Sequence, residues 1–145
     1  MRKLPLLLFA VLGTCAATCA AQEPHSLTDL QSTARILMVF APDSSSASYK
    51  RQLELIEHHA FELAQRNTVV VPASLTSNST DDFFPGENLP IVTPAEQADI
   101  RSKFHILPTD FVVILITQDG AIRIRSASPL DIRSLTASLD ALPRH

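Results

Sequence analysis

Four segments of the chain have the hydrophobic pattern of β-strands. Residues 36–40, Ile-Leu-Met-Val-Phe, form an unbroken apolar run, which is typical of a short strand buried on both faces. Residues 68–71 are mostly β-branched and end at Pro72, so they predict a second buried strand. Residues 111–116 form another apolar run and predict a third strand.

The fourth predicted strand follows the third through a hairpin. Residues 118–120, Gln-Asp-Gly, favour a tight turn, because glycine adopts a positive φ without steric cost. The residues after the turn alternate between apolar and basic, so we expect Ile122 and Ile124 to face the core. Arg123 and Arg125 would then face solvent at a sheet edge, where charge hinders pairing with other chains.

Three amphipathic segments predict α-helices, at residues 48–66, 93–104 and 129–142. The second begins Thr-Pro-Ala-Glu, which predicts a capping box with proline at the first helical position. The third opens with Ser-Pro-Leu-Asp at residues 128–131, by the same capping logic. In the first helix, the expected apolar stripe consists of Tyr49, Leu53, Ile56, Ala60 and Leu63. In the third it consists of Ile132, Leu135, Leu139 and Leu142.

The order of these elements predicts an α/β fold of the thioredoxin-like type. Two strands joined by one helix form a right-handed parallel unit. A connecting helix and a ββα unit complete a four-stranded mixed sheet flanked by helices, with the order βαβ-α-ββα. We expect one domain over residues 35–145 and a flexible segment over residues 22–34. A polar loop over residues 73–92 is unusually long for a compact domain, so it is either disordered or a binding element.

The first 21 residues predict an export signal. A basic start, an apolar centre over residues 4–12 and a small-residue end are typical of a secretory signal peptide, with cleavage expected after Ala21. Both cysteines, Cys15 and Cys19, lie in this segment. The alternative is that one of them becomes the lipidated first residue of an envelope lipoprotein. After ordinary cleavage the mature chain has no thiol and no transmembrane segment.

The net charge of the chain indicates which classes of binding partner are unfavourable. The full sequence has a formal net charge of −3. Loss of Arg2 and Lys3 with the signal peptide leaves ten basic and fifteen acidic residues, a net charge of −5. This balance argues against nucleic acid or an anionic membrane surface as a partner. We therefore expect a protein or peptide partner in the periplasm or the extracellular space.

Short segments along the chain match one family in their order and spacing: residues 35–43 (Arg-Ile-Leu-Met-Val-Phe-Ala-Pro-Asp), Tyr49, residues 52–53, 65–66, 119–120, Arg123, residues 125–126, 129–130 and 139–144. By these segments the sequence resembles the bacterial family called domain of unknown function 4174, also found in secreted animal matrix proteins as the P-DUDES domain. The resemblance implies an exported, thioredoxin-like domain, often suggested to be an interaction or adhesion module. It brings no established activity, so it implies no catalytic residue and no cofactor.

The loop after the first strand is the first candidate binding surface. In thioredoxin-like proteins the reactive thiol lies here, at a helix N-terminus that stabilises a thiolate. This chain instead has Pro42, Asp43, Ser44 and Ser45, followed by further serines. A serine hydroxyl cannot perform thiol exchange. These residues therefore form a turn and a helix cap, or they bind a small anion or a partner's carboxylate.

Pro108 and Thr109 are the second part of the candidate surface. They occupy the place where thioredoxin-like proteins have a cis-proline beside the reactive loop, although an ordinary trans proline is an equal alternative. If the bond before Pro108 is cis, Pro108 would lie near Pro42 and Asp43, and the shallow groove between them would suit an extended peptide that forms backbone hydrogen bonds.

The remaining polar residues give weaker signals. Arg123 and Arg125, with Arg35, are either a carboxylate-recognition stripe or a solvated edge. His58 and Glu62 have helical metal-ligand spacing, but a solvated helix face is the default interpretation, so no metal site is predicted. The leading hypothesis is a non-catalytic, exported binding module. The alternatives are an enzyme with a non-thiol site near Asp43, His105 and Pro108, and a lipid-anchored envelope component.

Overall fold

The structure is a computed structural model, which describes residues 27–75 and 92–142. The predicted signal peptide and most of the predicted polar loop lie outside these residues. No helix in the described ranges is long and apolar enough to cross a membrane. The elements, in order, are α1 (Leu27–Thr33), β1 (Arg35–Ala41), α2 (Ala47–His58), α3 (Ala60–Gln65), β2 (Thr68–Ser74), α4 (Pro94–Lys103), β3 (Val112–Ile116), β4 (Ile122–Ser126) and α5 (Ile132–Asp140).

The four strands form one mixed sheet in the order β2-β1-β3-β4. Strand β1 pairs in parallel with β2, from Arg35 opposite Thr68 to Ala41 opposite Ser74. It pairs antiparallel with β3, which in turn pairs antiparallel with β4. The residues of β1 from Ile36 onward are completely buried. The thioredoxin-like α/β fold, the central first strand and the edge position of the last strand are therefore confirmed.

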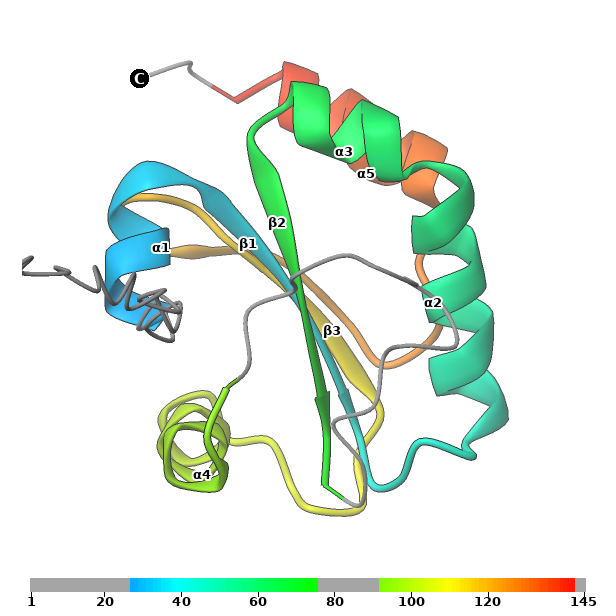
Figure 1. The fold of residues 1–145 in the computed structure, drawn as a ribbon, viewed down its shortest axis with the longest axis vertical. Helices are drawn as coiled ribbons and strands as arrows, with labels where there is room; N and C mark the ends of the chain where they lie inside the picture. Colours follow the sequence, from blue (N-terminus) through cyan, green and yellow to red (C-terminus); the bar gives the residue numbers. More distant parts are fainter. Residues whose placement is uncertain (1–26, 76–91, 143–145) are drawn as a thin grey trace, which may run out of the picture.

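Helices cover both faces of the sheet (Figure 1). Helices α2, α3 and α5 pack on one face, through Leu53, Ile56, Leu63 and the apolar stripe of α5. Helices α1 and α4 lie on the other face, against a cluster that includes Met38 and Phe40 of β1. Side chains of β1 alternate between the two clusters, because successive residues of a strand point to opposite faces. The unbroken apolar run of β1 thus fills both cores.

Side-chain caps begin both α4 and α5, but only α4 starts where the sequence predicts. The Thr93 hydroxyl accepts a hydrogen bond from the backbone N–H of Glu96, and the Glu96 carboxylate accepts one from the N–H of Thr93. This is the predicted capping box. Helix α5 begins at Ile132 and not at Pro129 as expected, because Asp131 is the N-cap and its carboxylate accepts a hydrogen bond from the N–H of Ser134. Each cap satisfies backbone donors that the first helical turn leaves without an intrahelical partner.

The N-terminal segment differs from the expectation of a flexible stretch over residues 22–34. Residues 27–33 form α1, and Leu27 and Leu30 pack against the core on the α4 face. Two apolar residues three positions apart share one side of a helix, which explains how so short a helix is held against the sheet.

The long helix expected over residues 48–66 is divided in two. His59 has a φ of −119°, and its N–H bonds to Ile56, three residues back. The predicted apolar stripe is nonetheless buried, except that Ala60 is only partly covered. Periodicity indicates which side chains are buried, but it does not show whether the helix axis continues unbroken.

Strand β2 runs through Pro72 and ends at Ser74, so the predicted end at Pro72 is wrong. Strand β2 lies at a sheet edge, and an edge strand accommodates a proline because its missing N–H can face away from the sheet. The loop expected from residue 73 begins after β2, and residues 76–91 lie outside the described part of the chain.

The hairpin contains a register shift that the alternating pattern conceals. Leu115 lies opposite Ile124, but the next residue, Ile116, lies opposite Ile122. This irregularity directs Ile122 to the core on the α4 face and Ile124 to the core on the α2 face. Both isoleucines pack against a core, as expected, but a bulge places them on opposite faces of the sheet. Gly120 has the expected positive φ, of 79°.

Candidate functional site

The turn after β1 is closed by its own side chains. The Asp43 carboxylate accepts hydrogen bonds from the backbone N–H of Ser45, at 2.9 Å, and from the Ser45 hydroxyl. The Ser45 hydroxyl, together with backbone donors of Ser45 and Ser46, lowers the pKa of Asp43. Ser46 is the N-cap of α2, although its side chain makes no capping hydrogen bond. These contacts favour the turn interpretation of the Pro42–Ser45 segment over an acid–base role for Asp43.

His105 ends α4. Its φ is +53°, and its N–H donates to the carbonyl of Ser102. The N–H of Ile106 donates to the carbonyl of Arg101 at 2.8 Å. This pair of hydrogen bonds around a left-handed residue is a Schellman motif, which satisfies the last carbonyls of a helix. The backbone position of His105 therefore has a structural role.

A tight, exposed turn follows. The N–H of Leu107 donates to the Asp110 carboxylate, and the N–H of Asp110 donates to the Leu107 carbonyl at 3.0 Å. Pro108 and Thr109 are exposed at the tip of this turn. No cis peptide bond occurs in the described residues, so the Leu107–Pro108 bond is trans and the cis alternative is wrong.

Arg101 joins this turn to the sheet. The side chain is 5% exposed, and its guanidinium donates to the carbonyl of Leu107 at 2.9 Å and to that of Ala41 at 3.1 Å. It also reaches the carbonyl of Ala73 at 3.5 Å and lies over the ring of Phe40, 5.1 Å from its centre. One guanidinium therefore holds together the end of β1, the end of β2 and the connection from α4 to β3.

Sequence reasoning missed Arg101, because arginine in an amphipathic helix is usually exposed. Burial lowers the pKa of Arg101, and the charge of Asp110 opposes this effect. The guanidinium has hydrogen bonds to carbonyls but no ion pair with a described residue. The sequence does show that Arg101 lies four residues after Gln97, so the two side chains share one face of the helix. The structure buries both of them.

Apolar side chains are exposed around this junction. Leu107 is 62% exposed and Leu75 is 47% exposed, and the N–H of Leu75 donates to the carbonyl of Ala41. Pro42 adjoins them on the chain after β1. We name the group of Pro42, Leu75, Leu107, Pro108 and Thr109 the Leu107 surface. The structure thus brings the two predicted loops to one end of the sheet and adds Leu75 to them.

Other predicted residues lie elsewhere or are already engaged. Arg123 pairs with Asp119 at 2.9 Å, and Arg125 donates to the backbone carbonyls of Phe104 and His105. Within the described ranges, no hydrogen bond joins Asp43, His105 or Thr109 to one another, and no group of three metal-ligating side chains occurs.

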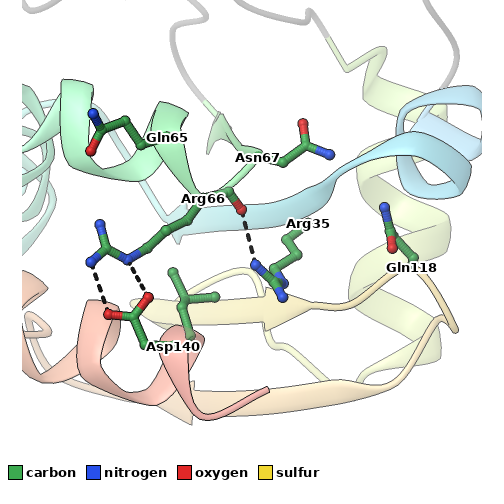
Figure 2. A pocket seen from close by; sticks show the side chains of 7 residues that line it. Arg35, Gln65, Arg66, Asn67, Gln118 and Asp140 are labelled. Carbon is green, nitrogen blue, oxygen red and sulfur yellow. Dashed lines mark hydrogen bonds and ion pairs between the residues drawn. The ribbon is translucent and has the colours of Figure 1, made fainter. Parts of the chain in front are cut away.

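A pocket lies at the opposite end of the sheet, and Arg35 of the predicted arginine stripe lines it, whereas Arg123 and Arg125 do not. Its volume is about 190 Å³. Figure 2 shows Arg35 between the Arg66–Asp140 ion pair and Gln118. Strand β1 starts at Arg35 and ends at Ala41, so the pocket and the Leu107 surface are separated by about 20 Å, at roughly 3.3 Å per residue.

Solved structures with a similar backbone include a peroxidoxin, a 2-Cys peroxiredoxin and a thiol:disulfide interchange protein. Peroxidoxin BcpB from Mycobacterium tuberculosis is 16% identical, with 81% of this chain and 86% of that chain covered and a TM-score of 0.63. A thiol:disulfide interchange protein from Bacteroides sp. is 12% identical, with 77% and 76% covered and a TM-score of 0.61. The reduced 2-Cys peroxiredoxin of Plasmodium vivax is 16% identical, with 79% and 80% covered and a TM-score of 0.61. At these identities the likeness shows the thioredoxin-like fold alone.

No curated protein sequence matches the chain. A family model does match it, over residues 26–145, and this range contains every helix and strand that the structure describes. The chain therefore belongs to the family described as domain of unknown function DUF4174.

Proposed function

We propose that this domain is a non-catalytic binding module that holds an extended segment of a partner protein on the Leu107 surface. The observation that carries the proposal is the buried Arg101 guanidinium, which fixes the exposed Leu107 turn beside the end of β1. Without this anchor, a turn with an exposed leucine would be mobile, and ordering it on binding would cost conformational entropy. A turn held in advance presents Leu107 and Pro108 as rigid contacts.

The chemistry of the surface suits a polypeptide. Exposed leucine and proline side chains offer apolar contact area, which drives most protein association. Thr109 makes no hydrogen bond with a described residue, so its backbone groups can pair with an extended chain. The neighbouring carboxylates of Asp43 and Asp110 are engaged by backbone N–H groups in their own turns.

The cysteine positions support binding over thiol exchange. Similar structures include a thiol:disulfide interchange protein, and this activity requires a thiolate. In this chain both cysteines precede residue 20, inside the predicted export signal. The turn after β1 presents Asp43 and serines instead. Insulin reduction by the purified mature protein at an enzyme-like rate would contradict the proposal.

Export is the second part of the proposal and rests on residues 1–21. Mass spectrometry of the native N-terminus tests it. Cleavage after Ala21 gives an unmodified chain beginning at Gln22. A lipidated Cys15 or Cys19 at the N-terminus would instead establish the envelope-anchored alternative, and an intact Met1 would contradict export altogether.

Site-specific cross-linking tests the binding surface. A photoreactive amino acid at Thr109 should capture a discrete protein in cells, while the same probe at Ala137, exposed on α5, should not. Leu107→Asp should abolish the capture, because it places a charge within the apolar contact. The matched variant Phe61→Asp replaces another exposed apolar residue, on α3, and should leave capture unchanged. Equal capture at both probe positions, or capture that survives Leu107→Asp, would refute the proposal.

A further inference from the structure

The pocket beside Arg35 has fixed polar walls. The Arg66 guanidinium donates to both oxygens of Asp140, at 2.8 and 2.9 Å, and also to the carbonyl of Glu62. This two-point ion pair ties α3 to α5 and holds both side chains in place. Arg35 donates to the carbonyl of Arg66 at 3.0 Å, which fixes the direction of its own side chain.

Two amides form the opposite wall. The side-chain N–H groups of Asn67 and Gln118 both donate to the carbonyl of Thr33, at 2.6 and 2.9 Å. This shared acceptor anchors both side chains at the end of α1. The guanidinium of Arg35 lies between this wall and the Arg66–Asp140 pair (Figure 2).

The size and lining of the pocket restrict the ligand. A dry cavity of about 150 Å³ holds a benzene ring in another protein, so a volume of about 190 Å³ admits a molecule only slightly larger. The side chain of Leu139, which is 1% exposed overall, borders the pocket and offers an apolar contact. The planar guanidinium of Arg35 matches the two oxygens of a carboxylate.

We infer that this pocket binds a small carboxylic acid. Its carboxylate contacts the guanidinium of Arg35, and its apolar body lies against Leu139. Asp140 forms an ion pair with Arg66 in the pocket wall. The positive charge of Arg66 reduces the repulsion between the Asp140 carboxylate and an anion bound beside Arg35. The pocket and the Leu107 surface share no residue, so this inference stands independently of the proposed function.

Benzoate and benzamide are matched probes, because they have nearly the same shape and differ in charge. The full chain, labelled with ¹⁵N, is titrated with each compound. Benzoate should bind with a dissociation constant in the range of about 0.1–10 mM, as is typical of so small a ligand. It should shift the side-chain amide signals of Asn67 and Gln118. Benzamide should shift them at least about tenfold less at equal concentration, because it lacks the charge that pairs with Arg35.

Two variants locate the carboxylate contact. Arg35→Gln should weaken benzoate binding by about tenfold or more, whereas Arg51→Gln, an equal charge change at an exposed site on α2, should change it less than about twofold. Equal affinity for benzamide would overturn the inference, as would signal shifts confined to other parts of the chain. The absence of binding at about 10 mM benzoate would also overturn it. The benzoate and benzamide titrations of the wild-type protein test the inferred carboxylate site even if Arg35→Gln does not fold.

Discussion

The side chain of Gln52 and the backbone of Leu130 are joined by a two-way hydrogen-bonded bridge. The Gln52 amide donates to the Leu130 carbonyl at 3.3 Å and accepts from the Leu130 N–H at 2.5 Å. Gln52 is completely buried on α2, and Leu130 lies just before α5. The bridge therefore connects two helices that are distant in sequence but cover the same face of the sheet (Figure 1).

Replacement of Gln52 should lower the free energy of unfolding. Gln52→Leu keeps a similar volume but leaves the N–H and carbonyl of Leu130 without these partners, so we expect a loss of about 2–4 kcal/mol in the free energy of unfolding. Gln65→Leu, at an exposed position on α3, should change it by less than about 0.5 kcal/mol. Urea unfolding followed by circular dichroism measures both. A Gln52→Leu protein as stable as the Gln65→Leu control would show that the bridge contributes little.

The capping box of α4 should make stability depend on pH. Backbone and side-chain hydrogen bonds from Thr93 lower the pKa of Glu96 below its ordinary value of 4.5. A carboxylate with a lowered folded-state pKa stabilises the protein above its unfolded-state pKa, and this contribution is lost as the pH falls through the folded-state pKa. Glu96→Gln should therefore be less stable than the wild type at pH 7 and nearly as stable at pH 3. Thermal unfolding from pH 7 to 3 measures the difference, and a difference that stays constant over this range would contradict the prediction.

His105 should be replaceable by glycine without loss of stability. Its left-handed backbone conformation at the end of α4 is one that glycine adopts more easily. We expect His105→Gly to raise the free energy of unfolding by up to about 1 kcal/mol. The control His58→Gly, at the last residue of α2, should lower it by up to about 0.5–1 kcal/mol, because glycine loses more backbone freedom in a right-handed helical turn. Chemical unfolding measures both, and equal destabilisation by the two changes would argue against the Schellman role of His105.

Much of the fold was predictable because local patterns agree with the final packing. The apolar run of β1 is buried on both faces, and the capping sequence before α4 forms the predicted hydrogen bonds. The failures have a common physical origin. The break at His59, the path of β2 through Pro72 and the bulge opposite Ile116 all depend on how neighbouring elements pack, and periodicity within one segment does not contain this information.

The candidate site was predictable only in part. Sequence order places Pro42 and Pro108 near the same sheet end once the fold is known, and the guanidinium of Arg101 joins the two loops there although the bond before Pro108 is trans. The group that joins them, Arg101, was not predicted, because a charged residue in a polar helix gives no sign of burial. The pocket beside Arg35 was also missed. Its walls come from five separate elements or turns, so no single motif marks it.

Replacement of Arg101 tests whether its hydrogen bonds to the carbonyls of Leu107 and Ala41 are needed for binding at the Leu107 surface. Arg101→Met preserves the apolar stem of the side chain but removes the donors to the carbonyls of Ala41 and Leu107, so we expect a loss of about 1–3 kcal/mol in stability. It should also speed hydrogen exchange at the N–H of Asp110, which closes the turn, more than at the N–H groups of β3. Cross-linking from Thr109 should weaken at the same time, because the turn is no longer held in place. Arg133→Met, at an exposed position on α5, should change none of the three measurements. If exchange at Asp110 does not change while stability falls, Arg101 serves the core alone, and the ordered Leu107 surface does not depend on it.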